Sequence, residues 1–164
     1  MNAVIVSRLD NCNSILYGIC EAELNRLQRL QNSCARLIYG RRKNDHVSDL
    51  FSELHWLPVK QRILFKILLF VFKIFIGMAP LYLETSVLIT DYDNRILHIP
   101  RSNTSIGDRA FSNCAPRLWN ALPISLRKAE TVSYFKKHLK HLLFSDFGAF
   151  ANEVNKYHTF INTH

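Results

Sequence analysis

The chain has 164 residues with a hydrophobic content of 48%, which suits a globular protein and lies outside the range of disordered chains. Its 21 lysines and arginines against 13 acidic residues give a net charge of +8, which favours polyanionic partners such as nucleic acid or an anionic membrane surface. The four cysteines lie far apart without a close pair, so a structural zinc site is disfavoured and reduced thiols are expected.

The first predicted helix spans residues 21–39. Two glutamates in its first turn and Arg36 near its end match the helix dipole, and Gly40 is a stop signal. Apolar residues recur every three or four positions and predict one apolar face: Leu24, Leu27, Leu30, Cys34, Leu37 and Ile38. A short helix is expected next, over residues 47–54.

A third helix is predicted from Pro58 to about Ile76, where the sequence GMAP interrupts it. Its apolar run is too short to span a membrane and contains Lys66 and Lys73, so we expect a buried amphipathic helix. The first ten residues lack the basic start and apolar core of a signal peptide. These features predict an intracellular location, in the nucleus or the cytoplasm, without a signal peptide or a transmembrane helix.

The second half of the chain predicts shorter elements. A short helix over 81–88 precedes a turn-rich loop over 90–109, which contains an extended piece near 96–99. Pro116 is expected to open a helix of one to two turns that Pro123 closes. The last amphipathic helix, over 131–144, has an apolar face made of Val132, Phe135, Leu139, Leu142 and Leu143.

The predicted fold is therefore mainly α, a compact bundle of about five or six helices. We expect one helical domain over residues 1–147. The polar segment 148–164 shows no periodicity and is expected to be a frayed, disordered tail.

Two segments, 25–44 and 54–83, contain cations and no acidic residue. At 100° per residue their basic side chains fall on single helix faces, which favours a surface that follows phosphates. The alternative is that these are solvated faces whose side-chain stems cover apolar surface. The candidate phosphate contacts are Arg26, Arg29, Arg36, Arg41, Arg42, Lys43, Lys60, Arg62, Lys66 and Lys73.

No motif for catalysis is present: there is no nucleophile elbow, glycine-rich phosphate loop, zinc-protease motif or kinase signature. We therefore predict no enzyme activity, no catalytic residue, no cofactor and no metal site. Asp91 and Asp93 could share a divalent ion, although a solvated turn is favoured. His138 and His141 could form half of a metal site, although solvated helix histidines are favoured.

The segment DRAFSNCAPRLWNALP, residues 108–123, combines aromatic, basic and proline residues. The spacing of Leu118, Trp119 and Leu122 favours packing toward a core, although Trp119 could instead be a platform on which a base stacks. Arg109 and Arg117 are its candidate phosphate contacts.

Several blocks follow one another in an order that resembles a known family. They are SRLDNCNSILYG, LNRLQRLQNSCARLIYG, HVSDLFSELHWLPVKQRILFKILLFVFKIFIGMAPLYL and GDRAFSNCAPRLWNALPISLRKAETVSYFKKHLKHLLF. Over residues 7–144 they resemble the region after the polymerase palm in non-LTR (LINE-type) retrotransposon reverse transcriptases, corresponding to the thumb and the segment beyond it.

The resemblance implies a helical, thumb-like piece that helps to hold template RNA and the growing DNA. The family's fingers, its palm with the Y-x-D-D-like catalytic carboxylates and its endonuclease have no counterpart in this sequence. The loop over 90–103 is shorter than in the family, and the segment after 147 matches no part of it. The resemblance therefore implies a fragment of an element copy, without catalytic residues.

These observations together predict a non-catalytic nucleic-acid-binding remnant of a reverse transcriptase, with RNA or an RNA/DNA hybrid as its partner. The alternative is a helical structural or interaction module, or a fragment without a function, that self-associates through the apolar helix 59–76. Peripheral binding to an anionic membrane is a third, less favoured alternative.

Overall fold

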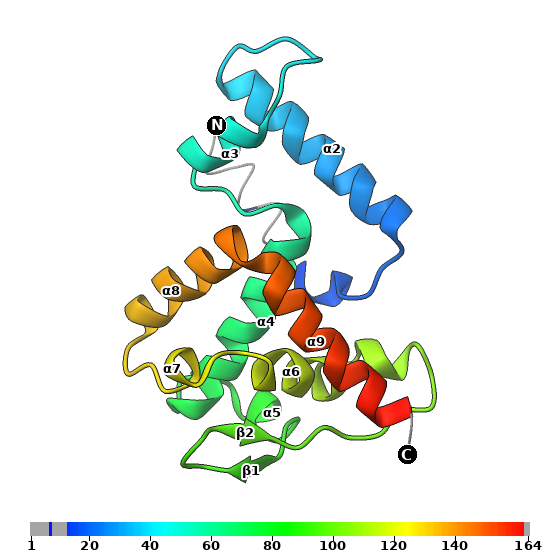
Figure 1. Cartoon of the computed structure of the whole chain (residues 1–164), viewed down its shortest axis with the longest axis vertical. Coiled ribbons are helices and arrows are strands. Elements are labelled where there is room, and N and C mark those ends of the chain that lie inside the picture. The colour runs from blue at the N-terminus through cyan, green and yellow to red at the C-terminus, as the bar shows by residue number, and fades with distance from the viewer. Residues whose placement is uncertain (1–6, 8–12, 163–164) are drawn as a thin grey trace. The chain divides into compact units, whose positions relative to one another are not determined.

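The computed structural model describes residue 7 and residues 13–162, with side chains described through residue 155 (Figure 1). This part of the chain is mainly helical, as predicted, and contains eight α-helices, two 3-10 helices and one two-stranded hairpin. It divides into an amino-terminal unit, up to residue 64, and a carboxy-terminal unit, from residue 65. The sequence had indicated one domain, and the boundary between the two units falls within helix α4 (Val59–Phe75).

The amino-terminal unit is built around helix α2 (Glu21–Ile38), which follows the 3-10 helix η1 (Asn13–Leu16) and packs against the short helix α3 (Ser48–Glu53). The predicted limits of α2 are confirmed to within one residue. Gly40 follows it with a φ of 60°, a left-handed conformation that glycine adopts without a steric penalty.

The buried face of α2 differs from the predicted leucine face. Gln31 and Ala35 are 0% exposed, whereas Leu30 and Leu37 are 57% and 68% exposed. The core cluster of this unit consists of Ala35, Leu50, Phe51 and Trp56. The prediction was wrong for the two leucines because this core covers only the stripe of α2 that runs through Gln31 and Ala35.

Two glutamine side chains, which we call the glutamine clamp, join α2 to the start of α4. Gln31 Nε2 donates to the carbonyl of Leu57 at 2.9 Å, and the N–H of Val59 donates to Gln28 Oε1 at 2.9 Å. Gln28 Nε2 also donates to Gln31 Oε1 at 3.2 Å. The clamp therefore binds the backbone on both sides of Pro58 and hydrogen-bonds an amide that the core has removed from water.

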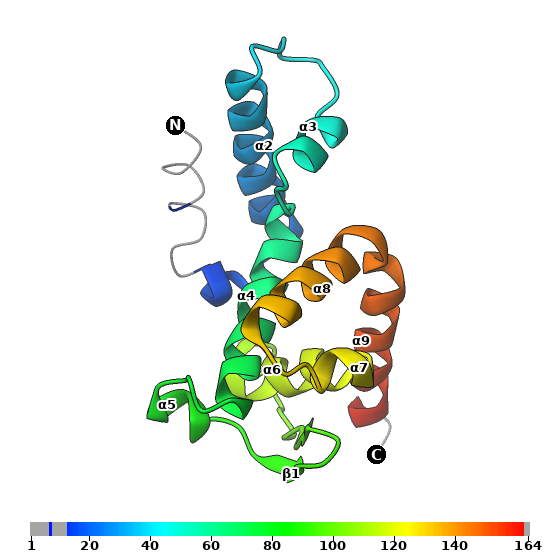
Figure 2. The same cartoon turned by 90° about the vertical axis from the view of Figure 1, so that its left-hand side faces the viewer.

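The carboxy-terminal unit contains the remainder of α4 and most of the other elements (Figure 2). These are α5 (Leu81–Glu84), β1 (Ile89–Asp91), β2 (Ile96–Leu97), η2 (Gly107–Arg109), α6 (Phe111–Asn120), α7 (Ile124–Arg127), α8 (Val132–Ser145) and α9 (Phe147–Asn162). Helix α8 contacts both α7 and α9, and α9 also contacts α6. Within the described residues, none of the helices combines the length and the apolar composition that a membrane span requires.

Aromatic rings form the centre of this unit. The rings of Phe72 and Phe135 stack with centroids 4.2 Å apart, and Trp119 lies 5.2 Å from Phe75 and 5.9 Å from Phe135. Trp119 is 0% exposed and its Nε1 donates to the carbonyl of Arg95 at 2.7 Å. The prediction that Trp119 packs in a core, with Leu118 and Leu122 beside it in sequence, is confirmed.

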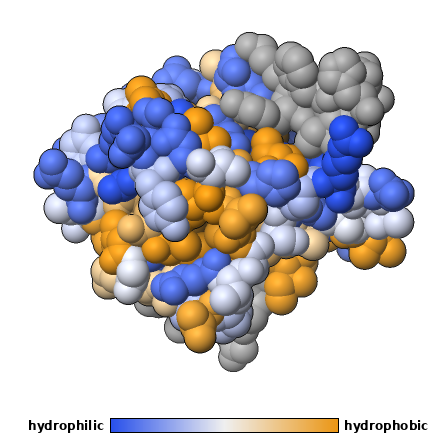
Figure 3. Space-filling view, turned by 90° about the horizontal axis from the view of Figure 1, so that it is seen from below, coloured by the Kyte–Doolittle hydropathy of each residue, from blue (hydrophilic) through white to orange (hydrophobic). Residues whose placement is uncertain are grey.

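Helix α4 does not present the exposed apolar surface that the self-association alternative assumed. Its central residues are almost completely buried: Ile67, Leu68, Val71 and Phe72. Exposed apolar side chains of this unit include a group near α5 and the hairpin: Met78, Leu81, Tyr82, Leu88 and Tyr92. Figure 3, seen from below, shows apolar surface interspersed with polar surface.

Pro116 lies inside α6, so the prediction that it opens a helix was wrong. Helix α6 begins five residues earlier, where the carbonyl of Ala110 accepts from the N–H groups of Asn113 and Cys114. Pro116 has no N–H to donate to the preceding turn, but its side chain is fully buried, and burial of the ring compensates for part of that loss. Pro123 precedes helix α7, which the sequence did not predict.

The loop predicted over 90–109 begins with a hairpin in which β1 and β2 pair antiparallel, so the extended piece near 96–99 is confirmed. Two arginines fasten the hairpin to α7. The side chain of Arg95 donates to the carbonyl of Arg127 at 2.7 Å, and the side chain of Arg127 donates to the carbonyl of Asn94 at 2.7 Å. From α6, the Asn120 amide accepts from the N–H of Leu97 at 3.0 Å and donates to its carbonyl at 2.8 Å.

Helix α9 occupies most of the segment that was predicted to be a polar tail. Phe150 and Val154 are 4% and 8% exposed, and the contacts of α9 with α6 and α8 account for this burial. Phe147, Phe150 and Val154 recur at spacings of three and four residues, which gives α9 a narrow apolar stripe. Residues 163–164 lie outside the described part.

Candidate nucleic-acid interface

The ten predicted phosphate contacts are divided between the two units. Eight lie in the amino-terminal unit, and Lys66 and Lys73 lie in the carboxy-terminal unit. A cation can contact a phosphate only if its side chain is exposed and is not held by other groups of the protein.

Two of the eight side chains form ion pairs at the surface. Arg26 lies 2.7 Å from Glu23 and Lys60 lies 3.2 Å from Glu21, and all four side chains are more than half exposed. Exposed pairs of this kind are worth about 0–1 kcal/mol, so a phosphate can compete for either cation.

Arg36 holds the loop that follows α2. Its Nε donates to the carbonyl of Asp45 at 3.0 Å, and the carboxylate of Asp45 accepts from the N–H of Arg42 at 2.9 Å. Together with the turn at Gly40, these bonds fold the chain so that the side chains of Arg41, Arg42 and Lys43 are exposed. Three consecutive cations on a braced loop form the densest positive surface among the predicted residues, and we call them the basic loop.

Arg29 is exposed on α2, with its Nε 3.3 Å from the carbonyl of Asn25 in the preceding turn. Arg62, in contrast, is 9% exposed, which leaves little of its side chain for a phosphate. Lys66 is half-buried with its ammonium group 5.5 Å from the centre of the Phe70 ring, and Lys73 is half-buried as well. The predicted stripe of Arg62, Lys66 and Lys73 is therefore less accessible than the basic loop.

The Tyr39 phenol lies at the end of α2, close to the basic loop. A hydrogen bond with the side chain of Glu53 raises the pKa of Tyr39 above its usual value of 10.0, with further contributions from burial and from the negative charge of Glu53. The phenol is therefore neutral at physiological pH and adds no negative charge beside the basic loop.

The prediction that Arg117 contacts phosphate was wrong. Its side chain is 3% exposed and lies 2.8 Å from the carboxylate of Asp108, which satisfies the charge within the fold. Arg109 is exposed and remains a candidate. Lys136 and Lys137 on α8 are exposed too, although they are not among the predicted phosphate contacts.

The structure also defines the surroundings of the pairs that suggested metal sites. Among the described residues, no three His, Cys, Asp or Glu side chains are arranged to hold a metal ion. Both carboxylate oxygens of Asp91 accept from Asn94, at 2.9 Å from its backbone N–H and 2.8 Å from its side chain, as in a turn.

Burial raises the pKa of the Cys114 thiol to about 12, so this thiol is protonated and unreactive at neutral pH.

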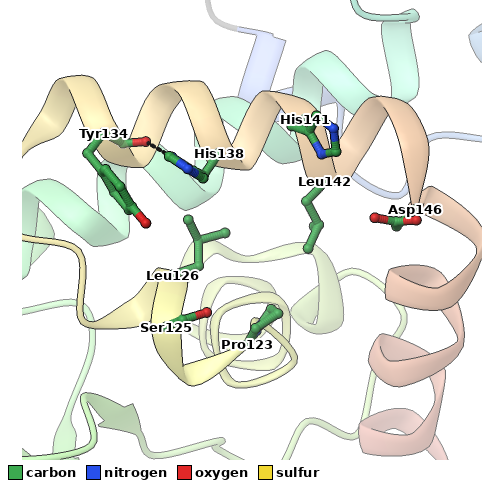
Figure 4. Close-up of a pocket in the computed structure, with 8 residues that line it drawn as sticks. All are labelled: Pro123, Ser125, Leu126, Tyr134, His138, His141, Leu142 and Asp146. Carbon is green, nitrogen blue, oxygen red and sulfur yellow. Dashed lines mark hydrogen bonds between the residues drawn. The ribbon is translucent and has the colours of Figure 1, made fainter.

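One arrangement in the carboxy-terminal unit was missed by sequence reasoning. The rings of Tyr134 and His138 stack on the surface of α8 with centroids 3.8 Å apart, beside a groove between α7 and α8 (Figure 4). The signal was the spacing of four residues between two ring-bearing side chains on one helix, which places them on the same face.

Comparison with known proteins adds no assignment: no protein-family model, no curated protein and no solved structure matches this chain. A function for this chain is therefore inferred from its own residues and from the resemblance of its sequence blocks.

Proposed function

We propose that the chain binds nucleic acid through phosphate contacts made by the exposed basic residues of the amino-terminal unit. In this proposal it is the non-catalytic, thumb-like remnant of a non-LTR retrotransposon reverse transcriptase, and its ligand is RNA or an RNA/DNA hybrid. Its place is inside the cell, in the nucleus or the cytoplasm.

The observation that carries this proposal is the basic loop. Arg41, Arg42 and Lys43 are exposed on a segment that Arg36 and Asp45 hold in place, so binding a polyanion does not require the loop to be ordered first. Arg29 adds a fourth exposed cation of the same unit. Four phosphate contacts on a single strand give a slope of log K against log salt of about −3.

The experiment is a fluorescence-anisotropy titration of single-stranded RNA and an RNA/DNA hybrid at several salt concentrations. The variant combines Arg41→Glu, Arg42→Glu and Lys43→Glu, and we expect it to bind at least about tenfold more weakly than the unmodified protein, with a shallower salt slope. Its matched control combines Arg101→Glu, Lys136→Glu and Lys137→Glu, which are exposed cations of the carboxy-terminal unit that were not predicted to contact phosphate.

The control variant has the same net charge as the basic-loop variant, so a specific interface requires the two to differ. Equal losses would show that net charge alone drives the association. An affinity that does not change between low and high salt would contradict phosphate binding altogether.

A second candidate function is a helical interaction module without a nucleic-acid role. It is favoured by the exposed apolar side chains near α5, where Leu81 and Tyr82 are 73% and 71% exposed. Size-exclusion chromatography with light scattering distinguishes the two functions. A monomer that binds RNA supports the first, whereas an oligomer that ignores RNA and becomes monomeric with Leu81→Ser and Tyr82→Ser supports the second.

A further inference from the structure

A two-part groove lies in the carboxy-terminal unit and involves none of the ten predicted basic residues. Its first part is a cavity of about 180 Å³ between α7 and α8. Its second part is a cavity of about 420 Å³ at the start of α8. Ser125 and Tyr134 line both parts, so the two cavities are neighbours that share one wall.

The first part is lined by both apolar and polar side chains, which come from the α7 side and from α8 (Figure 4). Pro123, Leu126 and Leu142 supply the apolar side chains, while His138, His141 and Asp146 supply the polar ones. A cavity of about 150 Å³ accommodates a benzene ring, so this part is large enough for one flat ring. A ligand that fits must be flat and apolar on its faces and must carry hydrogen-bonding groups on its edge.

The ring pair of Tyr134 and His138 gives this part a preformed stacking surface. Their planes differ by 24°, and His138 Nδ1 lies 2.9 Å from the carbonyl of Tyr134. Only an N–H can bond to a carbonyl oxygen, so this contact places a proton on Nδ1 and fixes the orientation of the ring. Tyr134 is still 49% exposed, which leaves much of its ring available to a ligand.

The second part is lined by groups that suit a ribose and a phosphate. The carboxylate of Glu130 can accept from ribose hydroxyls, and the hydroxyl of Ser125 can donate or accept. Thr131 Oγ1 caps α8 by accepting from the N–H of Tyr134 at 3.2 Å, and its own hydrogen can still be donated. The ammonium group of Lys128 is the cation in this lining and can pair with a phosphate. The two parts together therefore offer separate surroundings for a base, a sugar and a phosphate.

We propose that this groove binds a ribonucleotide, with its base against the Tyr134–His138 ring pair and its phosphate beside Lys128. The ligand is either a free nucleotide or one unstacked nucleotide of an RNA strand, because both present the same chemistry. The site goes beyond the proposed function and does not depend on it, since the basic loop belongs to the other unit.

The test is an NMR titration of the full chain with AMP, adenosine and p-cresol. We expect AMP to shift the resonances of Ser125, Tyr134 and His138. Replacing Tyr134→Ala should weaken AMP binding about tenfold, the loss that removal of one base-stacking aromatic ring causes, whereas Tyr134→Phe should stay within about twofold. Tyr92→Ala, which removes a 76% exposed tyrosine of the same unit, is the matched control and should change nothing.

Lys128→Ala separates the phosphate from the base: it should weaken the binding of AMP and leave the binding of adenosine unchanged. Competition by a short single-stranded RNA for the AMP shifts would identify a nucleotide within a strand as the ligand. No competition would identify a free nucleotide.

Three results would overturn the proposal. They are the absence of shifts at the groove at the highest soluble AMP concentration, equal effects of Tyr134→Ala and Tyr92→Ala, and binding of p-cresol as tight as that of AMP. The last result would make the groove a receptor for a peptide side chain. The basic-loop variant should bind AMP normally, so failure of the nucleic-acid interface and failure of the groove are distinguishable.

Discussion

Several arginines of the two units differ in whether they face solvent or are engaged within the fold. In the amino-terminal unit Arg29, Arg41 and Arg42 are exposed, while the buried polar contacts between elements are made by the neutral amides of the glutamine clamp. In the carboxy-terminal unit Arg95 and Arg127 donate to backbone carbonyls of distant segments, and Arg117 pairs with Asp108.

This difference shows that a high arginine content does not by itself define a binding surface. A guanidinium group that donates to carbonyls within the fold cannot serve a phosphate without losing those bonds. Both units are basic, yet Arg29, Arg41 and Arg42 face solvent whereas Arg95, Arg117 and Arg127 are bound within the fold.

The largest expected effect is in the aromatic core of the carboxy-terminal unit. Replacing Trp119→Ala removes a completely buried indole that contacts two phenylalanine rings, so we expect a loss of about 3–5 kcal/mol in the free energy of unfolding. Urea unfolding monitored by circular dichroism measures it. The exposed Tyr92→Ala of the same unit should change stability by less than about 0.5 kcal/mol, and a comparable loss there would refute the importance of this core.

Arginine substitutions compare the two units directly. Arg117→Ala leaves the carboxylate of Asp108 without its partner and should cost about 2–3 kcal/mol, below the usual range for a buried pair because Asp108 is 33% exposed. Arg41→Ala should change the free energy of unfolding by less than about 0.5 kcal/mol. Thermal and urea unfolding measure both, and similar costs for the two variants would remove the distinction between structural and exposed arginines.

The glutamine clamp provides the corresponding test in the amino-terminal unit. Gln31→Leu keeps a side chain of similar size in the core but leaves the buried carbonyl of Leu57 without this donor, at a cost of about 1–2 kcal/mol. Ser33→Ala, on the exposed side of the same helix, is the control and should be neutral within about 0.5 kcal/mol. Urea unfolding gives both values, and a neutral Gln31→Leu would mean that packing alone joins α2 to α4.

The smallest expected effect concerns the hairpin turn. Hydrogen bonds from the backbone and then the side chain of Asn94 are the main causes that hold the pKa of Asp91 below its usual value of 3.8. A depressed carboxyl pKa contributes stability above pH 3.8, and this contribution disappears as the pH falls through the pKa of the folded state. The stability difference between the unmodified protein and Asp91→Asn should therefore be smaller at pH 3 than at pH 7, as urea unfolding at the two pH values would measure.

Asp93→Asn is the matched control for the hairpin, because Asp93 lies in the same turn and contributes its backbone rather than its carboxylate to Asp91. Both variants remove one negative charge from the turn, but only Asp91→Asn removes the carboxylate that accepts from Asn94. If both variants behave alike, the charge of the turn matters and the hydrogen bonds from Asn94 do not.

Periodicity was enough to predict the helices that contain several apolar residues at regular spacing. Helix α9 has only a narrow stripe through Phe147, Phe150 and Val154, and this signal is weak beside the polar residues that surround it. Leu30 and Leu37 have the right spacing for a core, but the burial of a helix face depends on which segment covers it. Pro116 was predicted to begin a helix because proline favours that position. In the structure it lies inside α6, where burial of its ring in the core outweighs that preference.

The candidate sites show the same limit. Arg41 and Arg117 contribute equally to the net charge, but Arg41 is exposed and Arg117 is engaged within the fold. Arg117 is engaged because it pairs with Asp108, which lies nine residues earlier and meets it only in the folded chain. The groove beside Tyr134 depends on Ser125 and Leu126 of α7, a helix of four residues that the sequence did not indicate. Local patterns identify charges and faces, whereas pairing and concavity require the tertiary fold.

The side chain of Asn120 has a consequence for how this protein behaves at high concentration. Its amide occupies the N–H and the carbonyl of Leu97 on the side of β2 that faces away from β1. A strand edge with free backbone groups is a template on which another chain can add a strand, and repeated addition leads to fibrils. Asn120 therefore acts as an edge cap that ends the sheet at two strands and leaves only the three residues of β1 for such pairing.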